Sequence, residues 1–385
     1  MTTLGVLALI GICGLFGPLL SVAGRLAVPV VVGELVAGVI IGDTGFRIVH
    51  PTDPTLVLLS DVGFGMLMLG AGMRVPLRDA RLRSALRPGA IAAVVVGALA
   101  VPAGLLASHI GPSGHPAVYA VVLASGSAAI VLPIIEERGL GSRAALVAMA
   151  QVTLADIVAT LCVSIVLKPS LAGKAVLGTL AVAGGLLAIL LLARQLRRHD
   201  WVHKLRKTGK RQGWALDLRV SLIILFGLGW IAEQSGASVL IAGFGTGLLV
   251  AAIGGPKRLS TEVLGVAQGV FVPLFFVLLG AKLDVRALGS DPSLIVLALA
   301  LLGLNVAIHL IAALLTRQPP SAGLLAAAQL GVPSAVVSLG LTEGVLKPGQ
   351  GAAILVAAIG TLAFSSLGAA LMSRGATETT KTGKN

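Results

Sequence analysis

The chain has 385 residues, of which 56% are hydrophobic and 12% are charged, and its formal net charge is +13. The apolar residues come in blocks of about 20, the length that crosses a hydrocarbon core. Such blocks exclude a water-soluble fold. The basic residues fall between the blocks and form no single patch with aromatic residues, which argues against nucleic acid as a partner.

In chain order, the apolar blocks predict an all-α polytopic membrane protein with about 13 transmembrane helices. The blocks begin near Leu4, Ala27, Thr55, Ala85, Pro116, Ala144, Lys174, Ala215, Gly236, Val263, Ser293, Pro320 and Gly351. We expect them to form a single transmembrane transporter domain over residues 1–385, ending in a short polar cytoplasmic tail at 374–385.

The distribution of basic residues predicts the topology. Alternate loops, beginning with the one at Arg25, hold most of the Lys and Arg residues together with the C-terminal tail. The exceptions are Arg47, Lys168, Lys174, Lys282, Arg286 and Lys347. Because cytoplasmic loops of membrane proteins are enriched in Lys and Arg, we expect the N-terminus outside and the C-terminus in the cytoplasm.

Two stretches of the chain resemble each other when the stretch from Ala124 is laid over the stretch from Gly331. Ser127 then falls on Ser334. An odd number of predicted helices separates the two copies, so the second copy crosses the membrane in the opposite direction. Inverted repeats of this kind are common in alternating-access transporters.

Each copy of the repeat interrupts an apolar helix with small or helix-breaking residues. The interruptions are Ser125, Gly126 and Ser127 in the fifth helix, and Gly331, Val332, Pro333 and Ser334 in the twelfth. Unwound backbone inside a membrane is tolerated where it meets protein or lines a wet cavity, and its freed N–H and C=O groups then become ion ligands. We therefore predict two broken helices at an ion site. The alternative is that these small residues only permit close helix packing.

Asp156 lies near the middle of the sixth predicted helix, where a charge costs roughly 2.5–3.5 kcal/mol on insertion scales. Thr153, Thr160 and Ser164 share its helical face at spacings of three or four residues. This stripe of oxygen atoms suits a hard, oxygen-seeking cation. The alternative is a buried carboxylate that only hydrogen-bonds to a neighbouring helix. When the two copies are aligned, the counterpart of Asp156 is Ala363.

Other polar residues in the apolar blocks are weaker candidates. Asn305 lies in the middle of the eleventh predicted helix and is a candidate neutral cation ligand or hydrogen-bond partner. His309, one turn later, is expected to be a structural histidine rather than a pH sensor. Glu34 and Asp61 are expected to hydrogen-bond between helices, and Glu233 to lie at a helix end.

Five segments carry a resemblance to a known family: GELVAGVIIG, LSDVGFGMLMLGAGM, ASGSAAIVLP, LADIVA and PLFFVLLGAKLD. In their order and spacing they resemble the monovalent cation/proton antiporter family, in particular the branch of bacterial sodium/proton and potassium-efflux antiporters. The resemblance implies a homodimer in a bacterial inner membrane. It also implies a moving core, with helices at about 85–167 and 291–373, and a dimerisation scaffold, with helices at about 4–83 and 215–290.

The resemblance further implies that the broken fifth and twelfth helices cross beside the aspartate of the sixth helix. Asp156 matches this aspartate, and Ser127 stands where the family usually has Thr or Ser beside the ion. The chain departs from the family pattern at Ala155, which replaces an Asp or Asn, at Asn305, which replaces a basic residue, and at Val332, which replaces an acidic residue. Asp156 is then the only ionisable group at the centre, which favours electroneutral, one-for-one exchange.

Together these patterns predict a secondary active antiporter, not an enzyme, that exchanges a monovalent cation, Na+ or K+, for H+ by alternating access. Proton and cation compete for Asp156, while Ser127, Thr153 and Asn305 complete the cation site. No cofactor is expected besides the transported ions. The expected partners are the lipid bilayer and a second copy of the chain.

Two other transport functions remain open. An ion-coupled carrier of a small organic anion would need a fixed positive charge or exposed helix N-termini at its site, and no Lys or Arg is expected at mid-membrane. A gated cation channel would need a continuous polar pore, which Leu-, Val- and Ala-rich helices do not favour. A membrane-embedded enzyme is disfavoured because no HExxH, GxSxG or Cys/His cluster is present.

Overall fold

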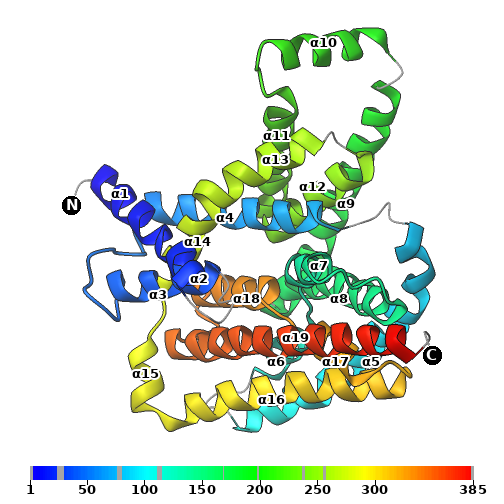
Figure 1. Ribbon diagram of the computed structural model, residues 1–385. Coiled ribbons are helices and arrows are strands. Elements are labelled where there is room, and N and C mark those ends of the chain that lie inside the picture. The colour runs from blue at the N-terminus through cyan, green and yellow to red at the C-terminus, as the bar shows by residue number, and fades with distance from the viewer. Residues whose placement is uncertain are drawn as a thin grey trace. The chain divides into compact units, whose positions relative to one another are not determined.

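The computed structural model describes residues 3–23, 30–75, 80–110, 115–167, 169–196, 199–235, 239–254 and 257–382. All regular elements in these ranges are helices (Figure 1). They form two compact units. Unit 1 comprises Met1–Arg78 and Lys168–Ala281, and unit 2 comprises Asp79–Leu167 and Lys282–Asn385. The assignment of a scaffold and a moving core remains a prediction.

Eight helical segments in the described part of the chain are long and apolar enough to cross a membrane. They are Pro54–Met73, Ser84–Ile110, Arg143–Leu167, Val176–Leu196, Thr261–Ala281, Pro292–Leu315, Pro320–Thr342 and Pro348–Ser373. Shorter apolar helices cover Leu4–Leu20, Val30–Ile41 and Val239–Ile253. The count of 13 helices therefore stays a prediction, and the expected helix start at Gly236 and the loop residue Arg25 lie outside the described residues.

Unit 1 contains the first and middle parts of the chain. Its helices are α1 (Thr3–Gly14), α2 (Phe16–Ala23), α3 (Val30–Ile41), α4 (Pro54–Met73), η1 (Pro169–Leu171), α9 (Ala172–Leu196), α10 (Asp200–Arg211), α11 (Leu216–Gln234), α12 (Val239–Ile253), α13 (Lys257–Val266), the π-helical turn η2 (Ala267–Phe271) and α14 (Val272–Ala281). Figure 1 shows α10, the most polar of these helices, lying across the ends of α9 and α11.

Helix α4 shows how local sequence sets a boundary. Asp53 precedes the helix, and its side-chain oxygen accepts hydrogen bonds from the N–H groups of Thr55 and Leu56 at 2.8 and 3.3 Å. Pro54 occupies the first turn, where its missing N–H costs no hydrogen bond because N–H groups there have no partner within the helix. An Asp-Pro pair at the end of a loop therefore starts this membrane helix at a defined residue.

Helices α4 and α12 pack through glycine. A Cβ atom placed on Gly247 of α12 would overlap the carbonyl oxygen of Leu69 and lie 2.8 Å from the Cα of Gly72. Small residues at such crossings let two helix backbones approach closely, which is a main source of helix association in membranes. The close packing of α4 on α12 thus depends on the absence of a side chain at this position.

Unit 2 contains two similar runs of helices. The first run is α5 (Ala80–Ile110), α6 (Pro116–Ala124), α7 (Ala128–Glu137) and α8 (Arg143–Leu167). The second is α15 (Val285–Ser290), α16 (Pro292–Leu315), α17 (Pro320–Ala326), α18 (Gly331–Thr342) and α19 (Pro348–Thr382). Helix α19 continues into the predicted tail, which is therefore helical from 374 as far as Thr382.

Both broken helices are present, and one break lies elsewhere than predicted. The first separates α6 from α7 at Ser125–Ser127, as the sequence indicated. The second lies at residues 328–330, so the prediction that Gly331, Val332, Pro333 and Ser334 form it was wrong. These residues are the first turn of α18. Proline is tolerated in a first turn because its N–H would be unpaired there anyway, so Pro333 starts a helix instead of interrupting one.

The helices that follow the two breaks give the repeat a different register from the sequence alignment. Pro116 and Pro320 begin the first halves of the two broken helices, and Arg143 and Pro348 begin the helices that follow them. In the register of α8 and α19, Asp156 corresponds to Thr361 and not to Ala363. The second copy thus has a hydroxyl where the first has a carboxylate.

A pair of Gly→Ala variants tests the α4–α12 crossing. Gly247→Ala should lower stability by about 1–3 kcal/mol, because overpacking forces backbones apart. Gly227→Ala in α11 is the control, since a Cβ there meets nothing within 4 Å and alanine favours a helix by roughly 0.5–1 kcal/mol. Thermal unfolding of the purified protein in detergent checks both. Equal effects of the two changes would contradict the proposed contact.

Candidate functional site

Asp156 is held inside unit 2 on α8. Its side chain is 7% exposed, and it is the only Asp, Glu, Lys or Arg from residue 144 to residue 167. The backbone N–H of Ala128, the first residue of α7, donates a hydrogen bond to its carboxylate. The carboxylate therefore lies at the N-terminus of α7, where unpaired N–H groups and the helix dipole favour negative charge.

The predicted stripe of oxygens on α8 is buried with Asp156. Thr153, Thr160 and Ser164 are each less than a tenth exposed. The hydroxyl oxygens of Thr153 and Ser164 have no hydrogen-bond partner in the protein. Buried polar atoms are nearly always paired, and a hydroxyl has lone pairs to offer a hard cation. Thr153 therefore has a free oxygen lone pair one helical turn from Asp156.

Ser127 lies at the start of α7. It is buried, and its carbonyl oxygen accepts the N–H groups of Ile130 and Val131 at 3.1 and 3.0 Å. The preceding Gly126 rests on α8, because a Cβ added there would lie 2.8 Å from the Cα of Val152. The first break thus runs directly over the backbone of α8 beside Thr153. Three predicted site residues, Ser127, Thr153 and Asp156, are brought together here.

Asn305 lies in the middle of its helix, as predicted, and its side chain makes hydrogen bonds. It is 1% exposed on α16, and its side-chain N–H donates to the carbonyl oxygen of Ala327 at 2.8 Å. Its side-chain oxygen accepts a hydrogen bond of 2.9 Å from Gln329. Both ends of the amide are therefore bonded to the second break, and these contacts favour a role in holding that break over a role as cation ligand.

Gln329 is a functional candidate that the sequence reasoning missed. It lies in the second break, and its side-chain nitrogen donates to the carbonyl oxygens of Leu123 and Ser125, both at 3.3 Å, as well as to Asn305. Its backbone N–H donates to the hydroxyl of Thr361 at 3.0 Å. Gln329 therefore joins the two broken helices. A lone amide within the apolar run GLLAAAQLGVP was the available signal.

His309 lies one turn after Asn305 and is 1% exposed. Its Nδ1 atom is 2.9 Å from the carbonyl oxygen of Asn305. A carbonyl only accepts, so Nδ1 must carry the proton in this contact. The bond ties the ring to its own helix, in line with the expected structural role.

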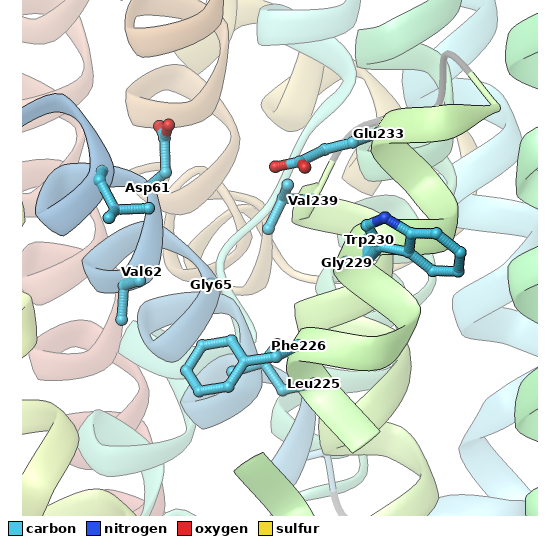
Figure 2. Close-up of a pocket in the computed structure, with 10 residues that line it drawn as sticks. Asp61, Val62, Gly65, Leu225, Phe226, Gly229, Trp230, Glu233 and Val239 are labelled. Atoms are coloured by element: carbon cyan, nitrogen blue, oxygen red, sulfur yellow. The ribbon is translucent and has the colours of Figure 1, made fainter. Parts of the chain in front are cut away.

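The acidic residues of unit 1 differ from Asp156 in their surroundings. Glu34 on α3 is 2% exposed, and its Oε2 atom has no partner, contrary to the expected helix-to-helix hydrogen bond for this oxygen. Asp61 and Glu233 line a cavity of about 140 Å³ between α4 and α11, which Figure 2 shows with both carboxylates near one end and Phe226 near the other. Both of these residues are exposed, whereas Asp156 is buried.

Comparison with known proteins gives the same class as the site. The model of the family described as sodium/hydrogen exchanger, transmembrane, matches residues 8–374. The glutathione-regulated potassium-efflux system proteins KefC of Salmonella newport and Salmonella heidelberg are 31% identical over 312 residues, which is 78% of this chain and 48% of theirs. The chain thus spans about half the length of these curated relatives.

A solved structure has a similar fold. The sodium proton antiporter MjNhaP1 from Methanocaldococcus jannaschii superposes with a TM-score of 0.64 over 98% of both chains, at 15% sequence identity. This likeness confirms the predicted all-helical transporter fold. The match of the family model over nearly the whole chain shows that this multi-span membrane protein belongs to the sodium/hydrogen exchanger family, a class of cation/proton antiporters and not of enzymes, as the sequence predicted.

Proposed function

We propose that the protein exchanges a monovalent cation, Na+ or K+, for H+ by alternating access, with Asp156 as the carboxylate that both ions share. The observation that carries this proposal is a buried, isolated carboxylate at a helix N-terminus beside the unpaired hydroxyl of Thr153. The similar proteins support it, since one is named a sodium proton antiporter and others belong to potassium-efflux systems.

Competition at one group is sufficient for exchange. Burial penalises the charged form of a carboxylate, so the side chain binds either a proton or a metal cation. With either bound, the site is nearly neutral. Empty, it holds an uncompensated charge in an apolar interior, and the cost of moving that charge prevents a leak.

The cation site we propose consists of the Asp156 carboxylate, the Thr153 hydroxyl and Ser127. Asn305 acts on the second break and not as a direct ligand. The helices at this site carry no other Asp, Glu, Lys or Arg in residues 116–135, 144–167, 292–316, 318–342 and 349–373. A single exchanging charge favours one cation for one proton, so the exchange is electroneutral. An organic-anion carrier is disfavoured because these helices hold no fixed positive charge and the N-terminus of α7 is already paired with Asp156.

The cellular setting is also part of the proposal. We place the protein in a bacterial inner membrane as a homodimer, with the N-terminus outside and the C-terminus in the cytoplasm. The basic residues support this orientation, because they gather in alternate loops and in the C-terminal tail. The dimer rests on the resemblance to the antiporter family.

Exchange in everted membrane vesicles tests the role of Asp156. With a pH dye inside the vesicles, Na+, K+ or Li+ added to the wild type should move protons. Asp156→Asn should reduce this signal to that of vesicles without the protein, because an amide cannot exchange a proton. Glu233→Gln, a matched change in the unit 1 cavity, should exchange normally.

Exchange by Asp156→Asn at the wild-type rate would refute this mechanism. If no monovalent cation moved protons in the wild type, a carrier of small organic anions would become the better explanation.

Thr153→Val separates ion binding from stability. Removing a buried hydroxyl without a partner should stabilise the ion-free protein by about 1 kcal/mol. It should also weaken cation binding about tenfold, equivalent to about 1.4 kcal/mol, and so reduce the rise in Tm that the cation gives. Melting in choline and in NaCl or KCl measures both effects, and Thr153→Ser is the control that keeps the hydroxyl. A Thr153→Val protein with full cation-induced stabilisation would remove Thr153 from the site.

A further inference from the structure

We propose that Gln329 is a positioning residue for cation–proton exchange, whose neutral amide ties the two broken helices together and so holds the N-terminus of α7 against Asp156. This inference rests on the proposed function of Asp156. It is carried by five hydrogen bonds around one buried side chain and its neighbour Asn305.

A broken helix leaves carbonyl groups unpaired at its end. At the end of α6, the carbonyl oxygen of Val122 is bonded by the Ser125 hydroxyl at 2.7 Å. The carbonyl oxygens of Leu123 and Ser125 accept from the side chain of Gln329. Unpaired backbone groups cost several kcal/mol each in an apolar interior. Gln329 therefore satisfies the end of α6 from the opposite broken helix.

Gln329 is itself held in a fixed position. Its side chain is 2% exposed. Its backbone N–H is bonded to Thr361 on α19, and the Thr361 hydroxyl donates onward to the carbonyl oxygen of Ala358 at 2.6 Å. The other side of the same break is bonded through Ala327 to Asn305. The amide thus projects from an anchored backbone, so its contacts with α6 are rigid.

The contacts of the Gln329 amide define its orientation. The Gln329 side-chain nitrogen faces three oxygen acceptors, on Leu123, Ser125 and Asn305. An amide nitrogen has two hydrogens, so one of them is shared between two acceptors. A flipped amide would place its oxygen against these oxygens. The network therefore admits only one orientation of the side chain.

The segment from Ser125 to Ala128 connects the contacts of Gln329 to the ion site. Gln329 holds the carbonyl oxygen of Ser125, and after Gly126 and Ser127 the chain reaches Ala128, whose N–H bonds to Asp156. Gly126 packs closely against α8, so the segment from Ser125 to Ala128 has little room to move. Without the Gln329 contacts, this segment is less restrained, and the Ala128 N–H is no longer held against Asp156. Because that N–H holds the carboxylate in place, a released segment leaves Asp156 less well positioned to bind the cation.

The test compares Gln329→Met with wild type in the vesicle assay and in melting experiments. Methionine keeps the length and much of the volume but donates no hydrogen bond. We expect the cation concentration for half-maximal exchange to rise about tenfold, or about 1.4 kcal/mol, with a smaller effect on the maximal rate of exchange. The cation-induced rise in Tm should shrink. Gln318→Met is the matched control, since that amide bonds only within its own helix end.

Gln329→Glu provides a second readout. A charged glutamate has no N–H to donate and places a second negative charge in the network. Exchange should therefore fall further than in Gln329→Met. It should recover partly as the pH is lowered, because a protonated glutamic acid donates one hydrogen bond to the carbonyl groups of α6. A loss that does not depend on pH would contradict the positioning role.

The positioning role and the proposed function fail in different ways. If Asp156→Asn abolishes exchange while Gln329→Met keeps the wild-type half-maximal cation concentration, Gln329 is structural only. The same conclusion holds if Gln329→Met lowers Tm equally with and without the cation. If wild-type vesicles do not exchange, or Asp156→Asn still does, the proposed function is wrong and the role of Gln329 in exchange falls with it.

Discussion

The structure depends on one constraint, which is that an interrupted helix in an apolar interior must find partners for its own backbone. Two helices of unit 2 are interrupted, at Ser125–Ser127 and at residues 328–330. The carbonyl groups that lack a partner within these helices accept hydrogen bonds from Gln329, Asn305 and Ser365. Ser365 donates to the carbonyl oxygen of Leu325 at 2.9 Å. All these donors are neutral. The N–H group at the start of α7 is paired instead with the charge of Asp156.

The sequence was a good guide wherever a single residue conflicted with its surroundings. A carboxylate in an apolar block identified Asp156, and a Ser-Gly-Ser run identified the first break. The second break was misplaced because Pro333 has two opposite meanings, as an interruption within a helix or as part of its first turn. Only the position of the helix start decides between them. The sequence alignment of the two copies put Ala363 opposite Asp156, whereas the starts of α8 and α19 put Thr361 there.

Sequence patterns could not predict the hydrogen-bond partners of Asn305 and Gln329. Asn305 stood out as a polar residue in an apolar helix, but its partner Ala327 lies 22 residues away on another element. The partners of Gln329 in α6 are 206 and 204 positions away in the chain. Helical periodicity relates residues three or four apart and carries no information at such separations. Of the two roles that the sequence left open for Asn305, cation ligand or hydrogen-bond partner, its contacts favour the second.

A neutral support for the broken helices has a consequence for selectivity. A lysine or arginine in the place of these amides would hold the carbonyl groups equally well, but it would also be a permanent cation tethered near Asp156. The transported cation would then have to compete for Asp156 with a positively charged side chain that is always present. Amides bind the helix ends without competing with the transported cation for Asp156. The carboxylate is left to the ions that come from solution.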